Sequence, residues 1–236
     1  MGFWAKLKKA RYGFDKNYLK SVRFSTWCRS TYLTFRYVDD FSIFPAIQFR
    51  GRFNIKISKE KGAQFIINDR LILERWTHRK ATTVIELKKN SKINIENQFI
   101  LGDGIKIYLN DDALLELKGR KHESGSGITG NSTILVKNSL LIGYDCIIAW
   151  DTFLTDCDWH TIFGKTHTES TIIGDKVWLG VGVKVLKGVT LGNGCIVTSN
   201  SVVTKGNYAE KSMLTGLPAK VVKENIANWT RDLIDQ

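Results

Sequence analysis

A six-residue period runs through the C-terminal half of the chain. Counted from Ile173, successive hexapeptides read IGDKVW, LGVGVK, VLKGVT, LGNGCI, VTSNSV and VTKGNY. The first positions are large and aliphatic: Ile173, Leu179, Val185, Leu191, Val197 and Val203. The fifth positions are small or β-branched: Val177, Val183, Val189, Cys195 and Ser201. A period of six is neither helical nor simple strand alternation. It fits short strands joined by turns. Each hexapeptide would form one flat side, and three such sides would make one coil.

The same register continues upstream and then weakens. From Ile142 the chain reads IGYDCI, IAWDTF and LTDCDW, whereas apolar clusters over 65–73, 83–87, 93–101 and 105–117 keep no strict spacing. We therefore expect a mainly β fold with irregular coils over 46–141 and regular coils over 142–223. Stacked coils would pair as parallel strands around an aliphatic prism. Gly174, Gly180 and Gly192 occupy second positions, and we expect them at corners that need backbone freedom.

The tract IIGDKVWLGVGVKVLKGVTLGNGCIVTSNSVVTKG, followed by GLPAKVVK, resembles the hexapeptide-repeat acyltransferases, in particular their sugar and polysaccharide O-acetyltransferases. This resemblance covers about residues 142–223. It implies a left-handed parallel β-helix, a homotrimer with active sites between neighbouring prisms, and acetyl-coenzyme A (acetyl-CoA) as the acetyl donor. We expect no metal, because zinc carbonic anhydrases with the same repeat need three histidines. Only His160 and His167 lie close together here.

The period stops at LTDCDWHTIFG, residues 154–164. The interval from Leu154 to Ile173 exceeds three repeats by one position, so we expect the chain to leave the prism over 159–172. The resemblance implies that such an extruded loop carries the catalytic histidine, and DCDWH resembles that site. His160 is the expected general base, because imidazole titrates near neutral pH and a sugar hydroxyl is a poor nucleophile.

Two carboxylates, Asp158 and Asp156, compete for the role of orienting His160, and either could instead cap a turn. Asp158 is favoured because a charge at a fifth position is costly unless the coil opens or a partner compensates it. Cys157 invites interpretation as a nucleophile, but the resemblance implies direct transfer without an acyl-enzyme. His167 is a candidate substrate contact on the same loop.

The resemblance also assigns residues to the acetyl-CoA site. Val181, the last residue of VWLGV, and Ser199, one coil later, would lie beside the pantetheine, and Trp178 would form a wall of the groove. The residues expected beside the adenine and the phosphates are Thr204, Lys205, Lys220 and Lys223. Asn200 departs from the family's usual glycine or alanine, which predicts an altered turn.

The charge is concentrated at the N-terminus. Residues 1–61 contain 14 Lys and Arg and four Asp and Glu, which gives +10 of the total net charge of +12. Aromatic and basic residues interleave over 1–45. We favour short helices that cap the first coil, since the end of a solenoid must be covered. A membrane-surface helix and a seat for an acidic polysaccharide are the alternatives. No nucleic-acid motif accompanies the charge, and nucleic acid is not expected as a partner.

Residues 224–236 are expected to form a C-terminal helix. The sequence shows no signal peptide, and four unpaired-looking cysteines suggest reduced thiols, which predicts a cytoplasmic protein or one at the inner membrane face. The predicted function is an acetyl-CoA-dependent O-acetyltransferase for a sugar hydroxyl of a surface polysaccharide or glycan precursor. The alternatives are a non-catalytic scaffold that binds glycan or a membrane surface, and an N-acetyltransferase for an amino sugar.

Overall fold

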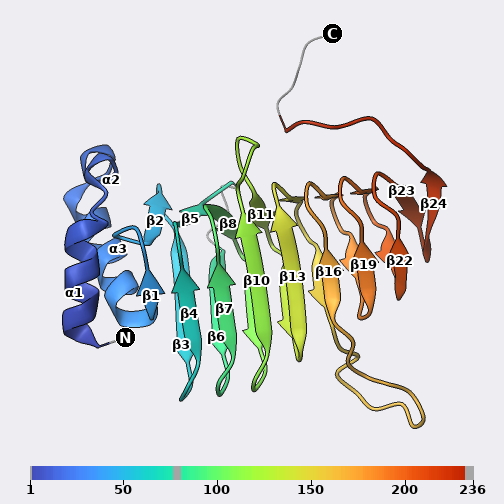
Figure 1. The fold of residues 1–236 in the computed structure, drawn as a ribbon, viewed down its shortest axis with the longest axis horizontal. Helices are drawn as coiled ribbons and strands as arrows, with labels where there is room; N and C mark the ends of the chain where they lie inside the picture. The colour runs from blue at the N-terminus through green and yellow to red at the C-terminus, as the bar shows by residue number, and fades with distance from the viewer. Residues whose placement is uncertain (1, 77–80, 232–236) are drawn as a thin grey trace.

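Except at the C-terminal end, each strand of the β region pairs in parallel with the strand three positions later in the chain, so the backbone winds into three sheets. The computed structural model describes residues 2–76 and 81–231. Three helices come first: α1 (Phe3–Tyr12), α2 (Lys16–Ser21) and α3 (Phe24–Tyr37). The coils then turn in a left-handed sense along an axis that leads away from these helices (Figure 1). The expected left-handed parallel β-helix with N-terminal helices is confirmed.

The three sheets form the three faces of the prism. Sheet 1 contains β1 (Asp40–Phe41), β4 (Gln64–Ile67), β7 (Lys92–Ile95), β10 (Leu114–Gly119), β13 (Ser139–Tyr144), β16 (Thr171–Ile173), β19 (Val189–Leu191) and β22 (Gly206–Tyr208). Sheet 2 contains β2 (Ile47–Arg50), β5 (Leu71–Glu74), β8 (Phe99–Asp103), β11 (Gly127–Gly130), β14 (Ile147–Ile148), β17 (Trp178–Leu179), β20 (Ile196–Val197), β23 (Met213–Gly216) and β24 (Ala219–Lys223), the last antiparallel to β23. Sheet 3 contains β3 (Asn54–Lys59), β6 (Thr82–Leu87), β9 (Lys106–Leu109), β12 (Thr133–Val136), β15 (Phe153–Thr155), β18 (Lys184–Val185) and β21 (Val202–Val203).

Coil length explains why the period is visible only near the C-terminus. In sheet 3, Lys184 pairs with Val202, so the coil between them comprises three hexapeptides. Earlier coils in the same sheet are longer, because Val84 pairs with Lys106 and Lys106 pairs with Thr133. Insertions at the corners therefore break the spacing in the sequence while the strands stay in register.

The predicted core positions are confirmed. The first positions of the hexapeptides from Ile173 to Val203 and the fifth positions from Val177 to Ser201 are all buried. Burial of each large aliphatic side chain contributes about 1.5–3 kcal/mol. In the early coils the interior holds bulkier side chains, among them Phe49, Phe65 and Phe99, so the prism is filled by larger residues where its strands are longer.

The second-position glycines serve a different purpose from the one expected. Gly174, Gly180 and Gly192 do not have positive φ; Gly182, two positions after Gly180, does, at 71°. A Cβ on Gly180 would lie 2.7 Å from the backbone nitrogen of Ser199 in the next coil. Glycine is therefore required at these three second positions because adjacent coils approach closely there, and the corner itself is formed further on.

The N-terminal helices cover the open end of the prism. Leu33, Thr34 and Ser30 of α3 are buried against the first coil. Thr34 Oγ1 accepts the backbone N–H of Ile47 at 3.2 Å, and the Tyr18 hydroxyl accepts that of Phe49 at 2.8 Å. Burial raises the pKa of Tyr18. These bonds satisfy backbone N–H groups of the first strand of sheet 2, which has no preceding coil to pair with. Covering such exposed backbone groups is what a capping segment must do.

The C-terminal segment does not form the expected helix in its described part. Residues 224–231 run in an extended path from β24 back across sheet 2 (Figure 1). Ile226 is buried and donates its N–H to the Lys211 carbonyl at 2.9 Å, and the Trp229 ring lies 6.0 Å from that of Trp178. Asn225 has a φ of 51°, which ends helical geometry, and docking of Ile226 and Trp229 on the sheet replaces helix formation. Residues 232–236 of the predicted helix lie outside the described residues.

Within residues 2–76 and 81–231, none of the helices combines the length and the apolar character needed to cross a bilayer.

Candidate active site

A loop between β15 and β16 projects from the edge where the chain passes from sheet 3 to sheet 1, here called the 3–1 edge (Figure 1). Its two arms are held together at the base. Cys157 and Thr168 form an antiparallel bridge, Asp158 donates its N–H to the His167 carbonyl at 2.8 Å, and Glu169 donates to the Asp156 carbonyl at 2.9 Å. The break in the hexapeptide period therefore corresponds to an extruded loop.

The insertion is longer than the spacing suggested. Leu154 pairs with Val185 in sheet 3, whereas Ile173 lies in sheet 1 and pairs with Ile142. Leu154 and Ile173 are thus on adjacent faces, where one hexapeptide would suffice, and the loop adds more than two hexapeptides to a coil that needs three. The count of one position beyond three repeats therefore understates the insertion, because Leu154 and Ile173 do not lie on the same face.

His160 is exposed on this loop, directly after an anchored tryptophan. Trp159 has a φ of 62°, donates from Nε1 to Thr155 Oγ1 at 3.1 Å, and packs edge-on against Tyr108 of sheet 3 with ring centroids 5.8 Å apart. The turn at Trp159 directs the chain away from the prism at His160. No other residue in the described part of the chain forms a hydrogen bond or ion pair with the His160 imidazole.

Asp158 contacts a lysine instead of His160. Its Oδ2 lies 2.5 Å from Lys187 Nζ, and the same ammonium donates to the Thr166 carbonyl on the other arm. Asp158 is exposed, so the coil is open at this fifth position. Lys187 is the counter-ion that compensates the charge. Both conditions were expected for a charged residue at a fifth position. No pattern in the sequence signals Lys187, because the contact depends on how the coil after the loop stacks on the coil before it.

Asp156 is a structural residue. It is fully buried, and its two carboxylate oxygens accept the backbone N–H groups of Lys137 at 2.7 Å and Asn138 at 2.6 Å. Burial raises its pKa, and the accepted N–H groups offset that effect only in part. With both oxygens occupied on the preceding coil, Asp156 stabilises the turn after β12, and the alternative that it orients His160 is wrong in this arrangement.

The remaining loop candidates are structural or solvent-facing. Cys157 is buried, and its Sγ accepts the Trp159 N–H at 3.2 Å, so the thiol supports the turn before His160. His167 is exposed on the return arm. Among the described residues, no group of three or more His, Cys, Asp and Glu side chains is arranged to hold a metal ion.

A second group of candidate site residues lies along the edge between sheets 2 and 3, here called the 2–3 edge. Val181 and Ser199 stack there in consecutive coils, joined by the bond from the Asn200 N–H to the Val181 carbonyl at 2.8 Å. Trp150 stands one coil earlier, and its carbonyl accepts the Gly182 N–H at 2.9 Å. Trp150 was missed, although the sequence holds a signal: all three residues occupy the third position of their hexapeptides. We call Trp150, Val181 and Ser199 the edge ladder.

Asn200 does not alter its turn, contrary to expectation. Its φ is 61°, beside 71° at Gly182 and 59° at Asp151 in the two preceding coils. Asparagine and aspartate tolerate this left-handed region better than other non-glycine residues. The corner therefore repeats unchanged along the edge ladder.

The other expected donor-site residues divide between the two edges. Trp178 is 41% exposed on the outer face of sheet 2, shortly before Val181, and contacts Trp229. Lys220 and Lys223 are exposed on β24 in the same sheet. Thr204 and Lys205 instead follow β21 at the 3–1 edge, where Lys205 Nζ lies 2.6 Å from Glu169 of the loop. Sheet 3 separates these two groups, so one chain does not bring the loop and the edge ladder together.

Comparison with known proteins agrees with this architecture. Residues 170–205 match the family described as Bacterial transferase hexapeptide (six repeats). The match covers the regular coils that follow the loop, and the three-sided coil is consistent with it, so in this region the chain is similar to the hexapeptide-repeat transferases.

Its relatives include O-acetyltransferases. The chain is 36% identical over 101 residues to "Putative lipopolysaccharide biosynthesis O-acetyl transferase WbbJ" of Escherichia coli (strain K12), over 36% of this chain and 50% of that protein. It is 35% identical over 136 residues to the polysialic acid O-acetyltransferase of Neisseria meningitidis, over 55% of this chain and 61% of that protein. The crystal structure of the polysialic acid O-acetyltransferase OatWY matches with a TM-score of 0.50 and 25% identity, over 80% of this chain and 92% of that one. The chain spans about half the length of several relatives: 50%, 54% and 45%.

Proposed function

We propose that this protein transfers an acetyl group from acetyl-CoA to a hydroxyl of a surface polysaccharide or glycan precursor, with His160 as general base. The O-acetyltransferase relatives support the reaction class. The position of His160, exposed directly after an anchored turn, supports its role, because a base must reach a hydroxyl that belongs to another molecule.

In the proposed reaction the oxygen of the sugar hydroxyl attacks the thioester carbonyl carbon. The neutral imidazole accepts the hydroxyl proton in the same step. A backbone N–H stabilises the oxyanion of the tetrahedral intermediate. Collapse of the intermediate breaks the carbon–sulfur bond and returns the proton from the imidazolium to the leaving thiolate. The products are the acetyl ester and coenzyme A, and no acyl-enzyme forms, consistent with the buried Cys157.

The edge ladder suits the pantetheine arm of the donor. Val181 and Ser199 have short side chains and are exposed, so an extended ligand has room to run along the prism edge. The exposed Lys220 and Lys223 lie toward the C-terminal end of sheet 2 and form no ion pair within the described residues, so both are available to phosphate groups.

The loop with His160 and the edge ladder lie at different edges of the prism. This separation supports the proposal that the active enzyme is a homotrimer. His160 and Lys205 belong to the 3–1 edge, and Val181 and Ser199 belong to the 2–3 edge. In a ring of three prisms, the 3–1 edge of one protomer can face the 2–3 edge of its neighbour, which completes a site that no single chain contains. A cytoplasmic location, where acetyl-CoA is made, fits this reaction.

Replacement of His160 by alanine tests the function. Incubation of the wild type with acetyl-CoA and a glycan panel should add one acetyl group to a sugar oxygen, detected by mass spectrometry. His160→Ala should lower turnover by about 10²–10⁴-fold and leave the thermal shift with coenzyme A nearly intact. His122→Ala, at an exposed histidine outside the loop, is the matched control. Full activity of His160→Ala would disprove the base assignment, and acetylation of amines alone would indicate the N-acetyltransferase.

A further inference from the structure

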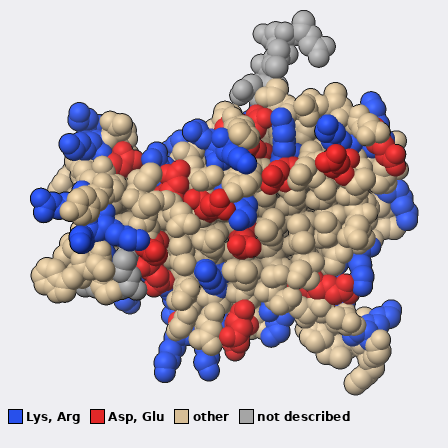
Figure 2. Space-filling model, viewed as in Figure 1, with Lys and Arg blue, Asp and Glu red and all other residues tan. Residues whose placement is uncertain are grey.

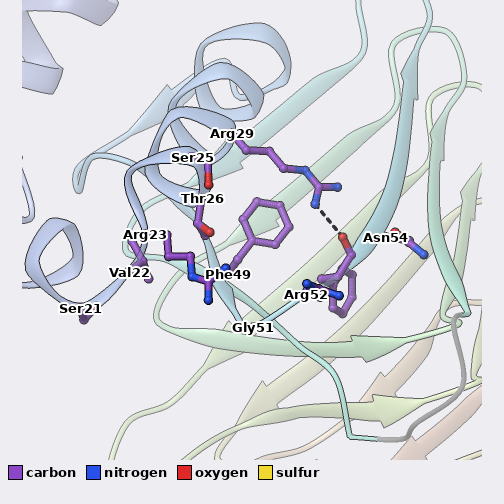
Figure 3. Close-up of a pocket in the computed structure, with 11 residues that line it drawn as sticks. Ser21, Val22, Arg23, Ser25, Thr26, Arg29, Phe49, Gly51, Arg52 and Asn54 are labelled. Carbon is purple, nitrogen blue, oxygen red and sulfur yellow. Dashed lines mark hydrogen bonds between the residues drawn. The ribbon is translucent and has the colours of Figure 1, made fainter.

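A basic pocket lies at the N-terminal end of the prism, where the first turn of α3 meets the turn between β2 and β3 (Figure 3). Its volume is about 690 Å³, within the range of small-ligand sites. Its lining includes Arg23, Arg29, Arg52, Phe49, Phe53 and Asn54. The proposed acetyl transfer uses none of these residues.

Three arginines supply the charge of this pocket, and no Asp or Glu among the described residues lines it. Arg23, Arg29 and Arg52 form no ion pair with any residue in the described ranges 2–76 and 81–231. Nearby arginines differ, since Arg50 pairs with Glu74 at 3.2 Å and Arg70 with Asp69 at 3.0 Å. Basic side chains gather over this helical end of the molecule (Figure 2). Three uncompensated guanidinium groups around one cavity favour an anionic ligand.

Arg29 is held in place by the fold. Its guanidinium lies 4.5 Å from the centroid of the Phe49 ring, and Nη1 donates to the Phe53 carbonyl at 2.8 Å (Figure 3). Stacking and one hydrogen bond fix the plane of the group, and its remaining N–H donors are left for a ligand. A pre-organised guanidinium loses less conformational entropy when it binds an oxyanion.

The rest of the lining fits a sugar ring better than a bare ion. Phe49 and Phe53 are buried at 1% and 3% exposure and form an apolar floor. Ser25, Thr26 and Asn54 are polar side chains at the rim that can bond with hydroxyl groups. An apolar floor, neutral hydrogen-bonding groups and several guanidinium groups together match a ring that carries hydroxyls and a carboxylate or phosphate.

The pocket and the edge ladder share one edge of the prism. Arg52 and Phe53 lie between β2 and β3, which is the 2–3 edge of the first coil. Val181 lies at the same edge after β17, five strand pairings further along sheet 2. At about 4.8 Å per pairing, the two sites are roughly 24 Å apart. A polymeric acceptor lying along this edge could reach both sites, whereas a single sugar could not.

We propose that this pocket binds an acidic sugar unit, carrying a carboxylate or phosphate, of a glycan chain whose other units extend toward the acetyl-transfer site. The link to an acceptor rests on the proposed function; anion binding in the pocket does not. A membrane surface fits less well, because the Phe49 and Phe53 rings are buried and cannot insert into a bilayer. The exposed aromatic side chains of α1, Trp4 and Tyr12, are not among the aromatic residues of this pocket.

Direct binding to the full-length protein tests the proposal. The probes are hexagalacturonate for carboxylate, glucose 6-phosphate for phosphate, neutral maltohexaose and phosphatidylglycerol vesicles. Binding is measured by calorimetry, or by co-sedimentation for the vesicles, at physiological salt. The variant is Arg23→Gln with Arg52→Gln, two exposed side chains without packing roles. The control for a general change in net charge is Arg11→Gln with Lys56→Gln, which removes two exposed positive charges outside the pocket.

The wild type should bind hexagalacturonate or glucose 6-phosphate at least tenfold more tightly than the Arg23 and Arg52 double variant, and should not bind maltohexaose. The control variant should stay within about threefold of the wild type. Equal weakening in both double variants would mean diffuse electrostatics and overturn the site, as would binding of vesicles alone. His160→Ala should bind as the wild type does. If the wild type lacks transferase activity but binds the acidic sugar, the proposed function fails and the pocket stands.

Discussion

Lys187 Nζ lies 2.5 Å from Asp158 Oδ2 and also donates to the Thr166 carbonyl, so one ammonium joins the two arms of the loop that carries His160. The Lys187 side chain is only 16% exposed, which reduces solvent screening of the pair. The position of His160 therefore depends on a residue of the following coil that does not contact the imidazole itself.

We predict that Lys187→Met impairs catalysis more than stability. Without the ammonium, Asp158 and the Thr166 carbonyl lose their common partner, and the loop samples positions in which His160 is misplaced. Misplacement by about 1 Å can cost roughly 10²-fold in rate. Steady-state kinetics should show kcat lowered by about 10–100-fold, while the melting temperature falls by only a few degrees.

Lys184→Met is the matched control, because Lys184 is exposed on the adjacent strand β18 and has no ion pair within the described residues. Its kcat should stay within about twofold of the wild type. Lys187→Arg should recover part of the lost rate, since a guanidinium can also bridge Asp158 and Thr166. A Lys187→Met enzyme with normal kcat would show that the loop holds His160 without this clamp.

Asp156 and Asp158 illustrate how far the sequence could predict this site. The interrupted period located the loop and His160, because a break in a regular repeat is a local property of the sequence. The partners of the two carboxylates were not predictable. Asp156 binds the backbone of Lys137 and Asn138, and Asp158 binds Lys187, and both contacts depend on which coil stacks against which.

The fold divides in the same way. The positions from Ile173 to Val203 were predictable because each coil there consists of three hexapeptides. The early coils have more residues between paired strands. Insertions at their corners remove the six-residue period from the sequence, although the architecture is the same. The C-terminal segment was misassigned because its apolar residues dock on sheet 2, a tertiary contact that overrides local helix preference.

The role of Asp156 predicts a loss of stability on Asp156→Asn. An amide retains one acceptor oxygen and places an N–H₂ donor against the second backbone N–H, at Lys137 or Asn138. A buried donor left facing a donor costs about 1–3 kcal/mol. Chemical denaturation should show the free energy of unfolding lowered by that amount. Asp151→Asn should change it by less than about 0.5 kcal/mol, because Asp151 is exposed at a φ of 59° that asparagine also accepts. An unchanged stability for Asp156→Asn would mean that the turn after β12 does not need the carboxylate.

Gly180 links coil packing to the proposed donor channel, and Gly180→Ala should damage both. The added Cβ would lie 2.7 Å from the Ser199 nitrogen and 2.9 Å from its Oγ, and a backbone atom in a paired coil cannot move away without disturbing the sheet. Overpacking of this kind costs about 1–3 kcal/mol, which for a chain of this length lowers the melting temperature by roughly 2–12 °C. Displacement of Ser199 should also weaken coenzyme A binding by severalfold, measured by calorimetry below the unfolding transition.

Gly206→Ala is the control, since a Cβ there would meet only the Tyr208 ring at an ordinary 3.6 Å. Loss of stability in Gly180→Ala with unchanged coenzyme A affinity would separate the edge ladder from donor binding, and the ladder would then be a purely structural feature of the prism.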